Sequence, residues 1–305
     1  MARFIARRLA VGLLVALAVL VLSFLLTRLS GDLAISIAGP DASAADIAQV
    51  RKAYGLDRPL YVQFADWAGR AAIGDLGESY FFKEKVSNLI ARRLPITVTL
   101  GLVGLALALV MSIPLGVLAA VREGSWVDRS VTLFTMIGQA MPSFWLGLIL
   151  MIVLGLKLGL LPISGTGTWQ HYVMPGIVLA FTAVPALTRL TRSGMLEALA
   201  SDYVRTARAK GLTRVSIIFK HALRNAAIPV VSVAAVQLGF LLGGSIVTES
   251  VFALHGVGFL AWESIGKNDF PVVQAVVLLL AVIYIALTVM ADILNAILDP
   301  RLRTA

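Results

Sequence analysis

The stretch Ser201–Arg224, SDYVRTARAKGLTRVSIIFKHALR, is the longest clearly water-facing segment in the second half of an otherwise apolar sequence. Ser201 or Asp202 can cap the start of a helix, and no helix breaker follows before Gly211, which supplies a stop. A second helix is expected from Thr213, because apolar residues then recur at helical spacing. Two short helices joined at a glycine, with apolar stretches on both sides, predict a rigid protrusion that a cytoplasmic partner grips.

Six apolar stretches dominate the rest of the sequence. The chain is 59% hydrophobic and only 14% charged, with a mean hydropathy of +0.89, which lies outside the range of soluble domains. A helix needs about 20 apolar residues to cross about 30 Å of hydrocarbon. The pattern therefore predicts an all-α integral membrane protein with six transmembrane helices: Leu9–Leu29, Val98–Val121, Val131–Leu156, Val173–Leu190, Ala226–Thr248 and Val272–Ile297.

The net charge of +9 is explained by membrane orientation. If the N-terminus is cytoplasmic, so is the C-terminus, and most lysines and arginines fall on the cytoplasmic side, as the positive-inside rule requires. These are Arg3, Arg7, Arg8, Arg122, Arg129, Arg189, Arg192, Arg205, Arg208, Lys210, Arg214, Lys220, Arg224, Arg301 and Arg303. No basic groove interleaved with aromatic residues supports a nucleic-acid partner. The first apolar run is longer than the core of a signal peptide, so we expect a retained span.

This topology divides the chain into four parts. Residues 1–29 form the first span with its cytoplasmic start, and residues 30–97 form an extracytoplasmic loop domain. Residues 98–297 form a five-helix core that contains a cytoplasmic loop at 194–225, and residues 298–305 form a cytoplasmic tail. The 30–97 segment balances eight acidic with eight basic residues, which is typical either of a solvated loop with an aromatic anchor or of a docking surface.

Four polar positions within the predicted spans are candidates for a translocation path, because lipid offers such groups no hydrogen-bond partner. They are Gln139, Ser143, Gln237 and Ser245. The alternative is that they only form hydrogen bonds between helices. Glycines beside them in the fifth span favour close helix packing, which is either a static contact or a moving interface: Gly239, Gly243 and Gly244.

Several catalytic and binding motifs are absent from the sequence. It has no G-x-x-x-x-G-K-[ST] phosphate loop, no H-E-x-x-H, no G-x-S-x-G and no cysteine. We therefore expect no cofactor, metal or catalytic site in this chain. Intramembrane acids and broken-helix repeats, which an ion-coupled carrier would use, are not evident either. A carrier that acts alone and a membrane scaffold without transport remain the alternatives from other classes.

The loop also resembles a known family. YVRTARAKGL followed by HALRNA is similar to the cytoplasmic motif of inner-membrane permease subunits of bacterial binding-protein-dependent ABC importers, and more narrowly to the peptide and nickel branch. Arg205-Thr206-Ala207 stands where the broad motif has E-A-A, and Gly211 takes the place of its glycine. His221, Leu223 and Arg224 depart from the motif's I-x-L-P. GLDRPLYVQFADW, GDLGESY and Gly256-x-Gly258 extend the resemblance over essentially the whole chain, although His255 replaces a usual proline.

The resemblance implies the type I (MetI-like) permease fold in the bacterial inner membrane, surrounded by lipid. It implies four kinds of partner: a second homologous permease (a heterodimer), two cytoplasmic ATPases that bind ATP and magnesium, an extracytoplasmic binding protein, and a peptide substrate. Glutathione and nickel chelates remain alternative substrates. The residues implied to couple to the ATPases are Asp202, Tyr203, Val204, Arg205, Thr206, Ala207, Arg208, Ala209, Lys210 and Gly211.

Overall fold

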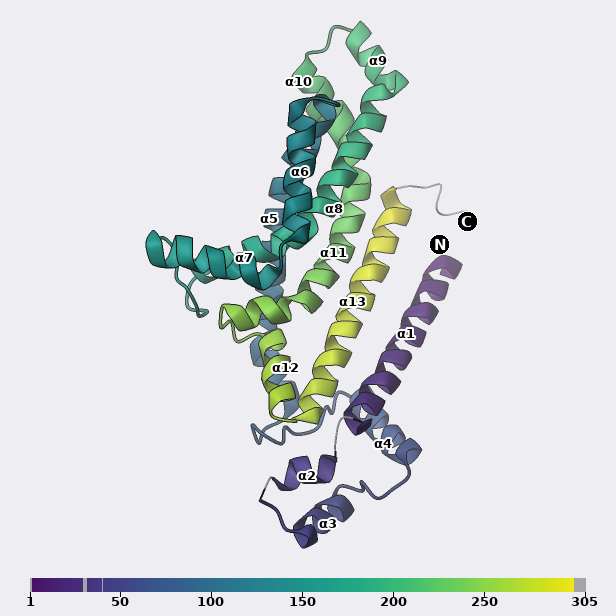
Figure 1. Ribbon diagram of the computed structural model, residues 1–305. Coiled ribbons are helices and arrows are strands. Elements are labelled where there is room, and N and C mark those ends of the chain that lie inside the picture. Colours follow the sequence, from purple (N-terminus) through teal and green to yellow (C-terminus); the bar gives the residue numbers. More distant parts are fainter. Residues whose placement is uncertain (1, 30–31, 40, 299–305) are drawn as a thin grey trace.

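The computed structural model describes residues 2–29, 32–39 and 41–298, and over these residues the chain is helical without a β-sheet (Figure 1). Seven α-helices lie in the first half of the chain: α1 Ala2–Leu29, α2 Leu33–Ala38, α3 Ala44–Ala53, α4 Leu60–Ala72, α5 Val86–Val121, α6 Trp126–Ala140 and α7 Ser143–Leu150. Six lie in the second half: α8 Val173–Ala200, α9 Asp202–Ala209, α10 Arg214–Ser216, α11 Leu223–Val251, α12 Val257–Gly266 and α13 Phe270–Leu298. Two π-helical segments, Met151–Lys157 and Ile217–Ala222, continue α7 and α10.

The predicted class of integral membrane protein is confirmed. Five helices in the described residues are long and apolar enough to cross a membrane, and a bent pair makes up to six. The helices run past several predicted limits. The helix α5 begins at Val86, so residues 86–97 belong to a long helix and not to a separate loop domain. The helix α8 continues to Ala200, past the predicted end of the fourth span at Leu190, and carries Arg189 and Arg192.

The expectation of one continuous third span over Val131–Leu156 is wrong. The chain bends by 101° between α6 and the α7 helix with its π-helical continuation. Figure 1 shows α7 running across the bundle instead of along it. The break falls at Met141, which has extended backbone (φ −82°, ψ 123°), because Pro142 disfavours the helical region for the residue before it. Pro114 lies inside α5, which continues through it.

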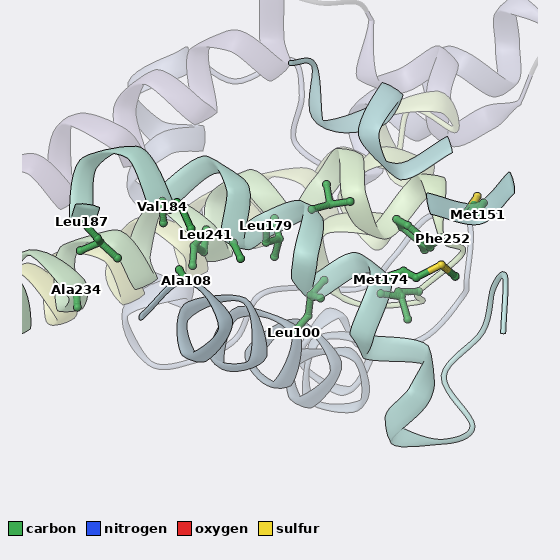
Figure 2. Close-up of a cluster of buried hydrophobic side chains, with 14 of the residues drawn as sticks. Leu100, Ala108, Met151, Met174, Leu179, Val184, Leu187, Ala234, Leu241 and Phe252 are labelled. Atoms are coloured by element: carbon green, nitrogen blue, oxygen red, sulfur yellow. The ribbon is translucent and has the colours of Figure 1, made fainter. Parts of the chain in front are cut away.

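The core is built where α5, α8 and α11 pack together. Figure 2 shows the buried side chains that join them, among them Leu100 and Ala108 of α5, Leu179 and Leu187 of α8, and Leu241 of α11. The helices approach closely at Gly116, where an added Cβ would lie 2.6 Å from Thr191 Cβ. Small residues allow such contacts, and packing then holds membrane helices together. The fourth predicted span, the shortest of the six, is thus at the centre of the bundle.

The two ends of the molecule carry different structures. The helices α9 and α10 protrude at one end, while α2, α3 and α4 gather at the other (Figure 1). The helix α1 lies against α13, where Arg8 pairs with Asp292 at 3.0 Å and the Gln274 amide donates to the Thr27 hydroxyl. Asp292, near the end of the last span, is therefore paired.

A buried carboxylate joins the segment before α5 to the loop before α13. Asp269 is 0% exposed and accepts hydrogen bonds from the Ser79 hydroxyl and from the backbone N–H groups of Tyr80 (3.0 Å) and Phe81 (3.3 Å). Three donors on one carboxylate satisfy a group that would otherwise be costly to bury. The Asp269 side chain therefore fixes the segment that precedes α5 against the bundle.

Candidate functional site

The helix α9 is a short, sharply bounded element between two long helices. It begins after Ser201, which has extended backbone (φ −72°, ψ 156°) and whose hydroxyl donates to the Ala198 carbonyl instead of capping α9. It ends at Gly211, which has a φ of +73° and donates its N–H to the Arg208 carbonyl at 3.0 Å. The left-handed backbone that allows this turn is strained for any residue with a β-carbon. The sequence-based prediction of a glycine stop is confirmed.

The inner face of α9 packs on the chain itself. Val204 is 0% exposed and Ala207 is 6% exposed, and both lie in a small cluster with Ile217 and the partly buried Leu199. The sequence analysis placed Val204 and Ala207 among the residues that couple to a partner. In the structure the two side chains hold α9 on the end of the bundle, because they are the apolar stripe of an amphipathic helix. Their role in coupling stays a prediction.

The outer face of α9 is exposed in this chain, and three of its four charged residues are basic. The exposed residues of the proposed coupling set are Asp202, Tyr203, Arg205, Thr206, Arg208, Ala209, Lys210 and Gly211. Asp202 and Arg205 form an ion pair at 3.2 Å, but both are so exposed that it contributes little to stability. The protrusion therefore presents an aromatic ring and several positive charges.

The base of the protrusion is braced by contacts that the sequence did not reveal. Thr213 caps the second short helix, as expected, by accepting from Ser216 N–H at 3.3 Å. That helix runs without interruption through the π-helical segment into α11. Arg192 of α8 binds Asp128 at the start of α6 through two hydrogen bonds of 2.7 and 2.8 Å. Bidentate pairs of this kind fix orientation as well as distance.

Two of the four predicted path residues share a cavity. Ser143 of α7 and Gln237 of α11 line a hollow of about 360 Å³ together with Thr182 of α8 and Thr248. Its remaining walls are Leu179, Phe240, Leu241 and Gly244. Gln139 does not line it and is exposed on α6. The cavity is mostly apolar with a few hydroxyl and amide groups, which is the usual chemistry of a small-molecule site.

The fourth predicted path residue, Ser245, belongs to a buried network instead. Its hydroxyl donates to the Glu249 carboxyl at 2.8 Å, and the Thr97 hydroxyl and the Phe259 N–H donate to the same carboxyl, also at 2.8 Å. Glu249 is 0% exposed. Three elements thus meet on one carboxyl: α5 through Thr97, α11 through Ser245, and the start of α12 through Phe259. The Val257 N–H of α12 donates in turn to the Thr97 hydroxyl.

The glycines of the G-x-G motif make this network possible. A Cβ on Gly256 would lie 2.5 Å from the Glu249 carboxyl, and one on Gly258 would lie 3.0 Å from it. The motif therefore serves close approach to Glu249, since Gly256 itself has ordinary extended backbone. The sequence analysis did not identify Glu249 as a structural or functional residue. The pattern that could have indicated it is an acidic residue at the end of an apolar span, followed by G-x-G. His255 is exposed, and no cluster of metal-binding side chains occurs among residues 2–29, 32–39 and 41–298.

The glycines of α11 serve two purposes. Gly239 packs against the Tyr284 ring of α13, where an added Cβ would lie 2.7 Å from the ring. Gly243 and Gly244 are exposed and have no neighbour within 4 Å of such a Cβ. Static packing thus accounts for Gly239, while the other two face space outside this chain's own core.

Comparisons with known proteins agree with one another. Residues 112–304 match the family described as the inner membrane component of binding-protein-dependent transport systems, and residues 1–101 match the N-terminal part of such membrane components. The chain is similar to the oligopeptide transport system permease protein AppB of Bacillus subtilis (41% identity over 99% of both chains). It is also similar to the glutathione transport system permease protein GsiC of Salmonella typhimurium (42% identity over 94% of both).

A solved structure shows the same fold. The inward-facing MetNI methionine ABC transporter superposes with a TM-score of 0.59 at 22% identity, over 69% of this chain and 96% of that one. The predicted MetI-like permease fold is therefore confirmed.

Proposed function

Because the chain belongs to the inner membrane component family of binding-protein-dependent transport systems, we propose that it forms half of the membrane pathway of an ABC importer. A second, homologous permease would supply the other half as a heterodimer. Two cytoplasmic ATPases would bind ATP and magnesium, and an extracytoplasmic binding protein would deliver the substrate. This chain would itself carry no cofactor and catalyse no reaction.

The helix α9 carries this proposal. An element that is pinned on its inner face by Val204 and Ala207 and stopped by Gly211 is rigid enough to transmit a force. Its outer face, with Tyr203, Arg205 and Arg208, is available to a partner. Closure of the ATPases on ATP would then push α9, and its neighbours α8 and α11 would move as one body between inward and outward access.

The proposed translocation path lies beside α11, at residues that no other part of this chain covers. Ser143 and Gln237 line the cavity beside α11, and Gly244 lies at its wall. The exposed Gly243 and Gly244 suit the close approach of another helix, and we assign that helix to the second permease. Gln139 is then placed to face the same partner from α6, while Ser245 holds Glu249 in place and does not meet substrate.

Peptides are the proposed substrate class, because relatives with about 40% identity over nearly the full chain are named for oligopeptide and glutathione transport. Glutathione is itself a short peptide, and nickel chelates are the remaining alternative. The test is uptake by the reconstituted complex with labelled di-, tri- and pentapeptides, glutathione and a nickel chelate. We expect ATP-dependent uptake of at least one peptide. Uptake that persists without the ATPases but requires an ion gradient would favour the solitary carrier.

The proposed orientation places both termini and α9 in the cytoplasm and α2–α4 outside. The chain has no cysteine, so single cysteines report position cleanly. Ser43→Cys and Lys267→Cys, both at exposed positions, should react with an impermeant thiol reagent on intact spheroplasts, and Val215→Cys should react only after lysis. Reaction of Val215→Cys but not Ser43→Cys on intact cells would reverse the orientation.

A further inference from the structure

A second cavity, of about 430 Å³, lies at the end of the molecule opposite α9. Its walls come from the last turn of α1, from α2 and α4, from segment 75–83 and from the first turn of α13. Arg28 is the last residue of one membrane-spanning segment, and Phe270 is the first of another. The cavity therefore lies at the depth where two spans leave the hydrocarbon, which is the depth of lipid headgroups.

Two residues that line this cavity each have one buried polar atom without a hydrogen-bond partner among the described residues. One is the Nε donor of Arg28, and the other is the Oε1 acceptor of Gln63. The Gln63 amide cannot be turned to solve this, because its Nε2 already donates to the Leu56 and Arg58 carbonyls at 3.2 and 2.8 Å. Buried polar atoms are normally satisfied. The described part of the chain thus supplies no acceptor for Arg28 Nε and no donor for Gln63 Oε1, in two residues of the cavity wall.

The charges around the cavity favour an occupant with one negative charge. Four cationic and three acidic side chains line it, and one of each is matched by the Arg58–Asp66 pair at 3.0 Å. Arg70 and Lys83 are exposed at the rim. Trp67 and Tyr80, side chains with an apolar body and a polar tip, complete the wall, as is common at membrane interfaces. The Tyr80 hydroxyl is a donor at neutral pH, and burial raises its pKa further, to about 12.

We propose that this cavity binds the headgroup of a glycerophospholipid from the adjacent leaflet. The phosphodiester would accept from Arg28, and a headgroup hydroxyl or ammonium would donate to Gln63. Phosphatidylglycerol fits both requirements, with one negative charge and two hydroxyl groups. Arginine forms strong charge-assisted hydrogen bonds to phosphate, and basic pockets beside membrane helices are suited to lipid headgroups. The proposal concerns neither the substrate path nor α9, so it can fail without affecting the proposed function.

The test is native mass spectrometry of the full permease complex, stripped of lipid in detergent and titrated with phosphatidylglycerol. The wild type should bind one added lipid tightly, and Arg28→Gln should bind it roughly tenfold more weakly, since one charge-assisted hydrogen bond is lost. Arg70→Gln should also weaken binding. Because Arg70 is at an exposed position that tolerates substitution, this variant tests the proposal even if Arg28→Gln does not fold. Arg92→Gln is the matched control: this exposed arginine pairs with Glu84 outside the cavity, and binding should be unchanged.

Three outcomes would overturn the proposal. If Arg28→Gln and Arg70→Gln both bind phosphatidylglycerol as the wild type does, the cavity is not a lipid site. If inorganic phosphate displaces the lipid at equal concentration, the ligand is a free anion. If dialanine displaces it, the cavity recognises peptide termini and belongs to substrate handling.

Discussion

Glu249→Ala is expected to lower both the yield and the thermal midpoint of the folded protein. The substitution removes the acceptor of three hydrogen bonds. The Ser245 hydroxyl can still donate to the Leu242 carbonyl at 2.9 Å, but the Thr97 hydroxyl and the Phe259 N–H lose their acceptor. Each unsatisfied buried donor costs about 1–3 kcal/mol, so the free energy of unfolding should fall by roughly 2 kcal/mol or more. The measurement is the yield of monodisperse protein and its thermal midpoint in detergent.

Glu249→Gln distinguishes the effect of the lost hydrogen bonds from the effect of the lost side-chain volume. Glutamine has the same size and keeps one oxygen as an acceptor, so it should recover most of the yield but lower the thermal midpoint. Glu263→Ala is the control on the neighbouring helix α12, where the carboxyl is partly exposed and has no role in the network. If Glu249→Ala and Glu263→Ala have equal midpoints, the network does not hold α5, α11 and α12 together.

Gly211→Val is expected to uncouple ATP hydrolysis from transport while leaving the spans inserted. Valine at a φ of +73° is strained by about 1–2 kcal/mol, and relief of this strain moves the end of α9. A shift of that size lowers the population of correctly placed α9 by roughly five- to thirty-fold. No atom lies within 4 Å of a Cβ at this position, so the effect is on the backbone and not on packing. Substrate-stimulated ATP turnover by the reconstituted complex measures it.

Gly74→Val is the matched control for Gly211→Val. Gly74 has a φ of +83° and equally open surroundings, but it lies at the other end of the molecule, after α4. It should carry the same local strain and keep normal turnover. Equal coupling in the Gly211→Val and wild-type complexes would mean that α9 is not the transmitting element. Ala207→Trp is no substitute for this experiment, because Ala207 packs against Ile217, and a larger side chain would dislodge α9.

The sequence predicted those features that depend only on residues close together in the chain. The membrane class follows from apolar stretch length, and the turn at Gly211 follows from the residue itself. The outcome at each proline depended on its surroundings: Pro114 remains inside α5, whereas Pro142 ends α6. The presence of a proline alone does not predict whether a helix continues or ends, because neighbouring helices decide whether the carbonyl that loses its hydrogen bond finds another donor.

The candidate site was predictable only in part, since its geometry depends on contacts between distant segments. Ser143 and Gln237 are far apart in sequence and meet because α7 turns across the bundle. Val204 and Ala207 could be assigned to the inner face only once Ile217 was placed beneath them. The role of Glu249 depends on the hydrogen bond from Thr97, which lies on a different helix. The sequence around Glu249 does not indicate this partner.

The unbroken path from Thr213 through α10 and the π-helical segment into α11 has a consequence for how this chain can vary. One continuous rod carries the base of the protrusion at its start, Gln237 in its middle and Glu249 near its end. Inserting or deleting one residue in such a rod would rotate everything beyond it by about 100°. Gln237 would leave the cavity, and Glu249 would turn away from Thr97. The number of residues between Thr213 and Glu249 is therefore fixed by the structure. Insertions and deletions should be tolerated only in the turns outside this segment.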